Sequence, residues 1–520
     1  MLKEFLAVGL SLSVALANDP LSAADADPRA STRQLIVRLK DDGLRHIQAV
    51  HRNDSIVDMR LPDGRPLSFV RHFNGNGMVL RLPADVSLEE AQRIAEKLTE
   101  NPAVASVQPD KRMYPALVPI DPDYPSQWHL FEDTAGIRMP TAWDQETGSG
   151  SIVIAQLDTG IIPHRDLNPA RILAGYDLIS DAATANDGDG RDPDPADTGD
   201  ATFDDECGVG VSGEASSWHG LAVAGVMVAE SDNITDIAGI DFAARLLPVR
   251  VLGKCGGDIS DVVDALRWAA GLRVAGVPDN PDPAKVINLS LSGVGACSFE
   301  EQAAINDAVN AGAVVVVAAG NEATDVAGIS PANCDNVVTV GAVGRDGSRA
   351  GYMNVGEQVD LSGPGGDGDV PNADGILTLF NTGSTAPLAD TLAEIQGTSF
   401  TTAQASAVAA MMWAVSSDAN VRLDPGMIQE ILRRTARAFP DSSSCAPGIC
   451  GQGILDADAA LAAAVEPESV LGGTGTDSGG GGGCALVTDG SSRVDPLFVL
   501  LLLAAGLRRC CRRRKTGLSA

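Results

Sequence analysis

The stretch "SIVIAQLDTGI", residues 151–161, joins an apolar run to the acidic turn Asp158-Thr159-Gly160. A run of Val, Ile and Ala with almost no polar residue predicts a strand that is covered on both faces. The turn that follows places the carboxylate of Asp158 at the carboxyl end of this strand. Asp and Gly are common in turns of every kind, so the role of Asp158 depends on what other segments bring to the same edge.

Similar apolar runs recur between about residues 119 and 465, where they alternate with segments of helical periodicity. The other expected strands are RLLPVRVLG, KVINLSLSG, AVVVVAAGN and NVVTVGAVG, and the expected helices are HGLAVAGVMVAE, ISDVVDALRWAAGLRVAG, FEEQAAINDAVNAG and SFTTAQASAVAAMMWAVSS. This alternation predicts an α/β fold with a mostly parallel central sheet and helices on both of its faces. In such sheets, functional sites gather at the carboxyl ends of the strands.

The region before residue 114 predicts a separate, small α+β domain. QLIVRLK, GMVLRLP and VASVQPD have strand patterns. SLEEAQRIAEKLTE has the pattern of an amphipathic helix that begins at Ser87, with Glu90 at the spacing of a capping box. The proline-containing stretch YPALVPIDPDYPSQW has no periodicity and is expected to connect this domain to the next.

We expect five segments: a signal peptide at residues 1–17, the small domain at 18–114, the α/β domain at 115–465, a glycine-rich linker at 466–483 and a tail at 484–520. Lys3, the apolar run 5–17 and the small residues Ala15 and Ala17 are typical of a signal peptide. The tail joins the apolar run 497–507 to an arginine cluster. That run is shorter than the roughly 20 residues of a spanning helix, although basic residues behind it are typical of a cytoplasmic end.

The overall charge narrows the class of partner. A formal net charge of −31 over 520 residues argues against a nucleic-acid-binding protein, because neutralising phosphates requires clustered Lys and Arg. The acidity fits a soluble, exported protein that can hold cations. In an exported chain the nine cysteines are candidates for disulfides, and the six between positions 207 and 450 alone allow about 15 pairings.

Three residue types that cooperate in nucleophilic catalysis lie at the ends of expected elements. Asp158 ends a strand, His219 opens a helix in SSWHGLAVAG, and Ser399 opens another in QGTSFTTAQASAVAA. A serine hydroxyl needs an imidazole to accept its proton and a carboxylate to orient that imidazole. Asn321, at the end of AVVVVAAGNE, could direct its amide at an oxyanion, although Gly-Asn is also an ordinary turn.

The Asp-Thr-Gly turn also allows a different chemistry, that of an aspartic protease. This requires a second such motif on a symmetric lobe. The candidate, Asp197-Thr198-Gly199, follows no strand and lies too close to Asp158 to leave room for a lobe. We therefore interpret Asp158 as the residue that orients His219.

Five ordered motifs resemble those of the subtilisin-like serine proteases, or subtilases: IVIAQLDTGI, WHGLAVAG, VINLSLSG, VVVVAAGNE and GTSFTTAQASAVAA, over roughly residues 121–464. The resemblance implies a serine endopeptidase in which Ser399 attacks the peptide bond, His219 transfers the proton, Asp158 holds His219, and Asn321 stabilises the oxyanion. It further implies two substrate-binding segments, Ser290-Leu291-Ser292-Gly293, which would pair with an extended peptide, and Ala318-Ala319-Gly320, which would wall the pocket for the P1 side chain.

The small N-terminal domain is similar to the inhibitory propeptide of the same family, which assists folding and blocks the cleft until it is removed. The resemblance implies cleavage between about Met113 and Asp121. A permanently attached domain is the alternative. Similarity to a secreted bacterial subgroup implies three disulfides: Cys207 with Cys255, Cys297 with Cys334, and Cys445 with Cys450.

The acidic stretch at residues 186–206 raises the possibility of bound calcium. Carboxylates at short loop spacing suit Ca²⁺, although a charge run is more often simply solvated. The expected ligands are Asp187, Asp189 and Asp192, together with Asp166, whose HRDL motif matches a calcium-binding position in several relatives.

The tail resembles the C-terminal sorting signals of exported Gram-negative proteins. This implies transient retention in the inner membrane followed by cleavage near Cys484. We expect the protein to be a secreted or cell-surface monomer whose partners are protein substrates and its own propeptide. The sequence departs from the family pattern at Gly220-Leu221-Ala222. This leaves a second hypothesis open, in which the chain is a catalytically silent, surface-displayed binding protein on a protease fold.

Overall fold

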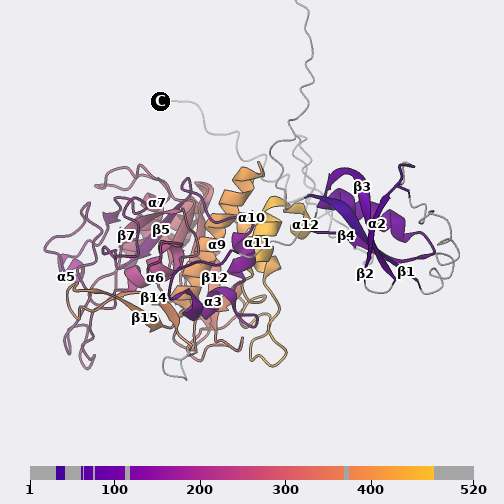
Figure 1. Cartoon of the computed structure of the whole chain (residues 1–520). Coiled ribbons are helices and arrows are strands. Elements are labelled where there is room, and N and C mark those ends of the chain that lie inside the picture. Colours follow the sequence, from indigo (N-terminus) through magenta and orange to yellow (C-terminus); the bar gives the residue numbers. More distant parts are fainter. Residues whose placement is uncertain are drawn as a thin grey trace, which may run out of the picture.

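The computed structural model describes residues 31–40, 60–61, 64–73, 76–111, 117–367 and 374–472. These residues form a small N-terminal domain and a larger α/β domain, each with its own sheet (Figure 1). The expected signal peptide, the C-terminal tail and residues 473–483 of the glycine-rich linker lie outside the described residues. No helix among the described residues is long and apolar enough to cross a membrane.

The N-terminal domain is a four-stranded antiparallel sheet with one helix. Its strands are β1 (Ser31–Leu39), β2 (Ser68–Phe73), β3 (Gly77–Ser87) and β4 (Val104–Pro109), in the order β2-β3-β1-β4, and its helix is α2 (Leu88–Thr99). Ser87 caps α2 by accepting a hydrogen bond from the backbone N–H of Glu90, as the sequence predicts. Leu35, Val37 and Leu80 belong to a hydrophobic core that is separate from that of the larger domain.

The α/β domain is built on a seven-stranded parallel sheet, which confirms the predicted fold class. Its strands are β5 (Val153–Asp158), β6 (Tyr176–Asp177), β7 (Arg245–Arg250), β8 (Val286–Leu289), β10 (Val314–Ala318), β12 (Val338–Val343) and β13 (Leu361–Pro364), in the order β13-β12-β10-β8-β5-β7-β6. Every residue of β5, β8, β10 and β12 is buried, because helices cover both faces of the sheet.

The helices lie in two groups against this sheet. In one, α6 (His219–Val228) packs on α9 (Thr398–Asp418), which contacts α11 (Ala457–Val465); in the other, α7 (Ile259–Ala269) packs on α8 (Phe299–Asn310). The helix α10 (Pro425–Thr435) lies against α11. Both α6 and α9 begin beside the carboxyl edge of the sheet, so their first residues meet the ends of β5 and β8.

Several elements escape the sequence analysis. The antiparallel hairpin β14 (Ile376–Asn381) and β15 (Asp390–Ile395) covers α6. The remaining short elements are η2 (Tyr124–Ser126), α3 (Trp128–Phe131), α4 (Met139–Trp143), α5 (Ala182–Ala185), β9 (Gly293–Val294), η3 (Val326–Gly328), β11 (Ile329–Ser330) and α12 (Glu468–Leu471). The last of these falls within the segment expected to be a linker.

Candidate active site

The structure brings Asp158 and His219 into direct contact. Nδ1 of His219 lies 2.7 Å from Oδ1 of Asp158. Asp158 ends β5, and His219 is the first residue of α6, so the pair joins the end of a strand to the start of a helix. Because the carboxylate accepts from Nδ1–H, the free lone pair of the neutral imidazole lies on Nε2, where a proton can be taken up.

The charge state of His219 reflects two opposed effects. Burial disfavours the imidazolium, but the Asp158 carboxylate and its hydrogen bond favour it, as do the carboxylates of Asp200 and Asp197. The favourable effects prevail and raise the pKa of His219 above its ordinary value of 6.5. The site therefore stabilises the protonated form that a general base must adopt during turnover.

Ser399 lies at the start of α9, beside the imidazole. The rings of His219 and Phe400 have centroids 6.2 Å apart, so the helix start and the histidine are neighbours. The hydroxyl of Ser399 donates to the backbone carbonyl of Ser290 at 3.2 Å rather than to His219. Ser290 returns a hydrogen bond from its own hydroxyl to the carbonyl of Ser399 at 2.9 Å. Rotation about χ1 between staggered positions is the motion by which Ser399 would reach Nε2.

Asn321 and the backbone N–H of Ser399 flank a common space. Oδ1 of Asn321 accepts from the backbone N–H of Thr398 at 3.0 Å and from its hydroxyl at 2.9 Å, which leaves the NH₂ group as the end free to donate. A Cβ placed on Gly397 would lie 3.7 Å from Nδ2 of Asn321 and 3.8 Å from the N of Ser399. Two donors that share one volume next to a serine can stabilise an oxyanion there.

The two segments expected to hold a substrate lie at the ends of two neighbouring strands, β8 and β10. Ser290 to Gly293 leave the sheet immediately after β8, which ends at Leu289. Ala318 ends the adjacent β10, and Asn354 holds the turn after it by donating to the carbonyl of Ala319 at 2.9 Å. The hydroxyl of Ser292 lies 3.5 Å from a carboxylate oxygen of Glu322, so its side chain adds a polar group to this wall.

The sequence analysis missed a support beneath the Asp158–His219 pair. The hydroxyl of Thr159 donates to Asp197 at 2.7 Å and accepts from the backbone N–H of Gly220 at 2.9 Å. It thereby ties the turn after β5 to the first turn of α6. Burial raises the pKa of Asp197 to about 6 although Thr159 and Gly199 donate to it. The second Asp-Thr-Gly motif thus serves to position the first.

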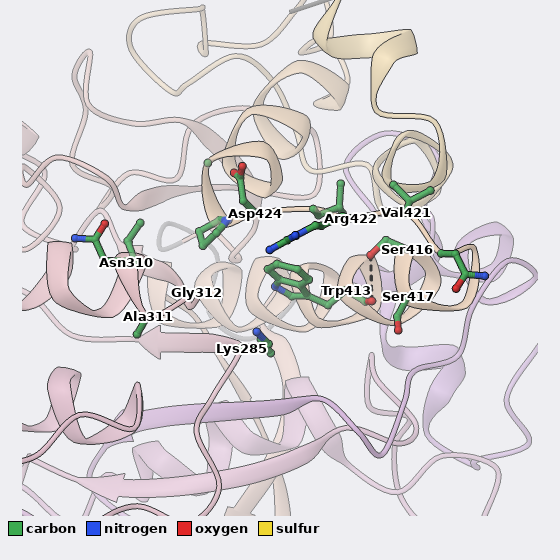
Figure 2. Close-up of a pocket in the computed structure, with 15 residues that line it drawn as sticks. Lys285, Asn310, Ala311, Gly312, Trp413, Ser416, Ser417, Val421, Arg422 and Asp424 are labelled. Atoms are coloured by element: carbon green, nitrogen blue, oxygen red, sulfur yellow. Dashed lines mark hydrogen bonds between the residues drawn. The ribbon is translucent and has the colours of Figure 1, made fainter. Parts of the chain in front are cut away.

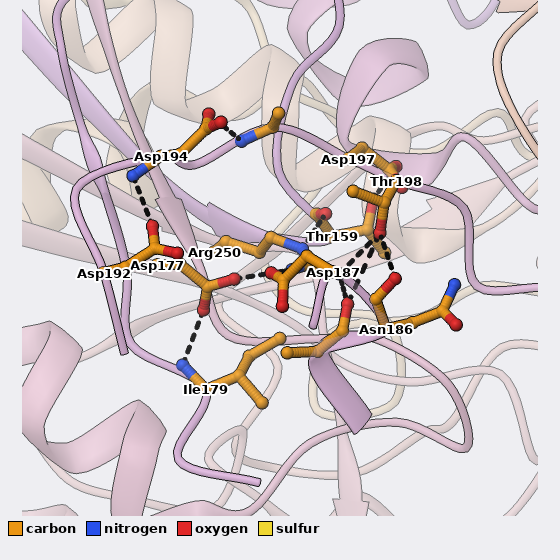
Figure 3. A network of polar contacts seen from close by, with 12 residues as sticks. Thr159, Asp177, Ile179, Asn186, Asp187, Asp192, Asp194, Asp197, Thr198 and Arg250 are labelled. Carbon is orange, nitrogen blue, oxygen red and sulfur yellow. Dashed lines mark hydrogen bonds and ion pairs between the residues drawn. The ribbon is translucent and has the colours of Figure 1, made fainter. Parts of the chain in front are cut away.

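A buried arginine joins the same turn to the acidic loop (Figure 3). The guanidinium of Arg250 donates to the carbonyl of Thr159 at 3.1 Å, and to the carboxylates of Asp177 at 2.5 Å and Asp187 at 2.8 Å. It also donates to the backbone carbonyl of Ala185. Its side chain is only 1% exposed and that of Asp177 is fully buried, so this ion pair is removed from water, whereas the side chain of Asp187 is 16% exposed. The signal in the sequence was an arginine in the interior of the apolar run RLLPVRVLG.

Three of the four expected metal ligands converge. Carboxylate oxygens of Asp187, Asp189 and Asp192 lie within 4.8 Å of one another. A side-chain hydrogen bond with Asp192, together with the negative charge of that neighbour, raises the pKa of Asp189. These hard oxygen donors fit Ca²⁺, although Asp187 already pairs with Arg250. Asp166 is not part of this cluster: its carboxylate accepts from Nδ2 of Asn233 at 2.7 Å and from the N–H of Ile237 at 3.0 Å.

The structure joins the six cysteines of the α/β domain in the pairs that the resemblance implies: Cys207–Cys255, Cys297–Cys334 and Cys445–Cys450. The first of these links a loop near His219 to the turn that follows β7. Cys484, Cys510 and Cys511 lie outside the described residues.

A cavity of about 820 Å³ lies at the opposite edge of the sheet, beside Lys285 at the start of β8. The indole of Trp413 lies there between Lys285 and Arg422 (Figure 2), with Nζ of Lys285 at 5.2 Å from the ring centroid. None of the four candidate catalytic residues lines this cavity. A smaller cavity of about 390 Å³ is lined by His219 and Ser290.

Known proteins resemble this chain in sequence and in structure. The model of the subtilase family matches residues 149–470. The "Extracellular protease" of Xanthomonas campestris pv. campestris is 44% identical over 399 residues, or 77% of this chain and 66% of that protein. The "Extracellular basic protease" of Dichelobacter nodosus is 38% identical over 402 residues, or 76% of this chain and 64% of that protein. The chain thus spans slightly less than two thirds of the length of each of these relatives.

A solved structure of a protease from Pseudoalteromonas arctica is 47% identical in sequence. It covers 67% of this chain and 100% of its own, with a TM-score of 0.64.

Proposed function

The chain belongs to the subtilase family, and from this premise we propose that it is a secreted serine endopeptidase that hydrolyses peptide bonds in proteins. The observation that carries the proposal is the pairing of His219 with Asp158 at 2.7 Å beside the helix start that bears Ser399. The names of the two relatives, both extracellular proteases, support secretion. The size and chemistry of the site are consistent with a monomer that needs no second chain to complete it.

In the proposed reaction, Oγ of Ser399 attacks the scissile carbonyl carbon and passes its proton to Nε2 of His219. Asp158 keeps Nδ1 protonated and stabilises the imidazolium. The oxyanion accepts from Nδ2 of Asn321 and the N–H of Ser399. His219 then returns the proton to the leaving amine, and a water molecule hydrolyses the acyl-enzyme by the same steps.

The test is hydrolysis of casein by the purified mature protein, with and without Ser399→Ala. We expect the substitution to lower kcat by several orders of magnitude, because no other group replaces the nucleophile. Thr401→Ala, two residues further along α9, is the matched control, since its buried hydroxyl donates to the backbone carbonyl of Thr398 within the helix. Hydrolysis that survives Ser399→Ala would remove Ser399 from the mechanism. Absence of hydrolysis by the unaltered protein would favour the silent binding protein.

We further propose that residues 18–114 act as an inhibitory propeptide. A separate core in the N-terminal domain supports this, because a unit with its own core can leave without unfolding its neighbour. If Ser399 performs the cleavage, full-length Ser399→Ala should accumulate uncut. Mass spectrometry of the active protein should find its first residue between about Met113 and Asp121. An N-terminus before Met78 on the active protein would contradict the proposal.

The tail is proposed to act as a sorting signal that is cut near Cys484. Mass spectrometry of the C-terminus of the secreted protein tests this. Detection of Arg513 in that protein would contradict it.

A further inference from the structure

The smaller cavity beside the candidate active site has two kinds of wall. Its apolar lining includes Leu252, Val211 and the disulfide between Cys207 and Cys255. Its polar lining consists of serine and threonine residues and two acidic residues, Asp200 and Glu214. His219 is the only lining residue that can carry a positive charge. The cavity therefore combines apolar surface with a net negative charge.

The loop that supplies both carboxylates, residues 200–217, contains five acidic residues and no lysine or arginine. Three of the five hold the loop together: Asp204 accepts from Gly213 N–H at 2.8 Å, Asp205 from Gly210 N–H at 2.6 Å, and Glu206 pairs with Lys254 at 2.6 Å. These three acidic residues have partners elsewhere and do not line the cavity, whereas Asp200 and Glu214 do.

Asp200 and Glu214 differ in how they are held. The carboxylate of Asp200 is half-buried and accepts from the N–H of Ser217 at 2.7 Å and from its hydroxyl at 2.6 Å, so its position is fixed. Glu214 is exposed, and among the described residues its carboxylate has neither a hydrogen bond nor an ion pair. One carboxylate is thus preorganised, and the other is free to move onto a ligand.

The strand order shows which part of a substrate would enter the cavity. The segment Ser290–Gly293 follows β8. The proposed P1 wall lies at the end of β10, the neighbour of β8 on one side, and the cavity lies near the ends of β5 and β7, on the other side of β8. Successive side chains of an extended peptide point in opposite directions. A peptide with P1 against Ala318–Gly320 would therefore direct P2 toward His219 and this cavity.

We propose that Asp200 and Glu214 determine specificity by favouring a lysine or arginine at P2 of the substrate. The inference rests on the proposed peptidase function and names part of its substrate class. An apolar wall accommodates the aliphatic stem of such a side chain while carboxylates meet its charged end. The charge-assisted hydrogen bonds available to Asp200 and Glu214 have no equivalent for an apolar P2 residue.

The test uses three peptides that share a P1 residue the enzyme accepts and differ only at P2, with lysine, norleucine or glutamate. Lysine and norleucine have the same carbon chain, so the ratio of their kcat/KM values isolates the charge. We expect a lysine-to-norleucine ratio of about fivefold to tenfold for the mature enzyme. This is the effect of adding the interaction free energies of two partly exposed charge pairs. The ratio should fall to within about twofold of one in Glu214→Gln/Asp200→Asn, and partway in Glu214→Gln alone.

The control is Asp279→Asn, which removes one negative charge from an exposed residue between α7 and β8, near the opposite edge of the sheet. It should keep the full ratio, whereas 0.5 M NaCl should reduce the ratio in the unaltered enzyme. A ratio at or below one, or a ratio unchanged in the double variant, would overturn the P2 assignment while leaving the peptidase intact. Failure to cleave any of the peptides, or cleavage that survives Ser399→Ala, would overturn both proposals.

Discussion

Asn321 and Thr398 are joined by two hydrogen bonds that end on one atom, Oδ1 of the amide, at 3.0 and 2.9 Å. Both donors belong to the residue that precedes Ser399. The orientation of the amide is therefore fixed by the first turn of the helix that supplies the proposed nucleophile. The NH₂ group of Asn321 and the N–H of Ser399 are held as one unit, so an oxyanion would meet donors that need no rearrangement.

Removing one of these two hydrogen bonds at a time should show how much the fixed orientation of the Asn321 amide contributes to kcat. Asn321→Ala removes the donor and should lower kcat by about 10²- to 10³-fold. Thr398→Val keeps the backbone bond and removes the hydroxyl, so we expect a loss of about tenfold in kcat with KM little changed. Thr398→Ser, which restores the hydroxyl, should recover most of the activity. A Thr398→Val enzyme as active as the unaltered one would show that the backbone bond alone positions Asn321.

The raised pKa of His219 predicts the acid side of the pH profile. Catalysis requires the neutral imidazole, so kcat/KM should fall as the pH drops through a pKa above 6.5. Asp200 is one of the carboxylates that raise this pKa. Removing its charge in Asp200→Asn destabilises the imidazolium, and the acid limb should move to lower pH by about 0.3–0.5 units. The measurement uses a peptide with neutral P2, and a limb that moves to higher pH would contradict the electrostatic account.

The sequence predicted the five inner strands of the central sheet because each is a continuous apolar run that can be recognised without knowledge of its neighbours. It did not predict the edge strands β6 and β13, which are only two and four residues long. It extended several elements past their observed ends, and two of them show why. The segment KVINLSLSG was expected to be a strand throughout, but β8 stops at Leu289 because Ser290 turns to bond with Ser399. The helix that begins at Ile259 stops at Ala269, followed by Gly271 with φ of +81°, a conformation that favours glycine.

The supports of the site could not be predicted in the same way. Thr159, Asp197 and Gly220 meet only because β5, the acidic loop and α6 converge in space. Nothing in their local sequence distinguishes a bridging threonine from one in a turn. The candidate triad was predictable because its chemistry restricts residue type, whereas Thr398 and Thr159 act through geometry that several residue types could supply.

Calcium removal is expected to lower stability if the acidic cluster holds an ion. Chelation with EGTA should reduce the Tm of Ser399→Ala, a background that prevents autolysis, since a bound ion stabilises only the folded state. Asp189→Asn/Asp192→Asn should abolish most of the difference between calcium and EGTA. Asp279→Asn/Asp282→Asn provides the control with the same loss of charge. An equal response to EGTA in both double variants would place any calcium outside this cluster.

Arg250 is expected to be the most sensitive charged residue beneath the site. Arg250→Met would leave the fully buried carboxylate of Asp177 without its counter-charge, at a cost of about 3–5 kcal/mol in the free energy of unfolding. It would also free the carbonyl of Thr159 next to Asp158. Urea unfolding in the Ser399→Ala background measures this cost. Arg273→Met, which breaks an exposed pair with Asp279, should cost less than about 1 kcal/mol. Equal costs for the two variants would contradict the role given to Arg250.

His129 provides a separate test of how burial affects stability. Its side chain is fully buried in α3, and among the described residues neither ring nitrogen has a hydrogen-bond partner. Burial lowers its pKa from 6.5 to about 3. Between these values the unfolded chain binds a proton at this position that the folded chain does not. The free energy of unfolding should therefore fall as the pH drops below 6.5, by at most about 1.4 kcal/mol per pH unit from this group.

His129→Leu removes that titration and should flatten the dependence. Buried carboxyl groups such as Asp166, whose pKa burial raises to about 7, act in the opposite direction. They are present in both proteins, so their contribution cancels in the difference. Urea unfolding at pH 8, 6, 5 and 4 in the Ser399→Ala background should give curves for the two proteins that diverge steadily below pH 6.5, with His129→Leu the more stable. Parallel curves would mean that His129 is protonated as readily in the folded protein as in the unfolded one.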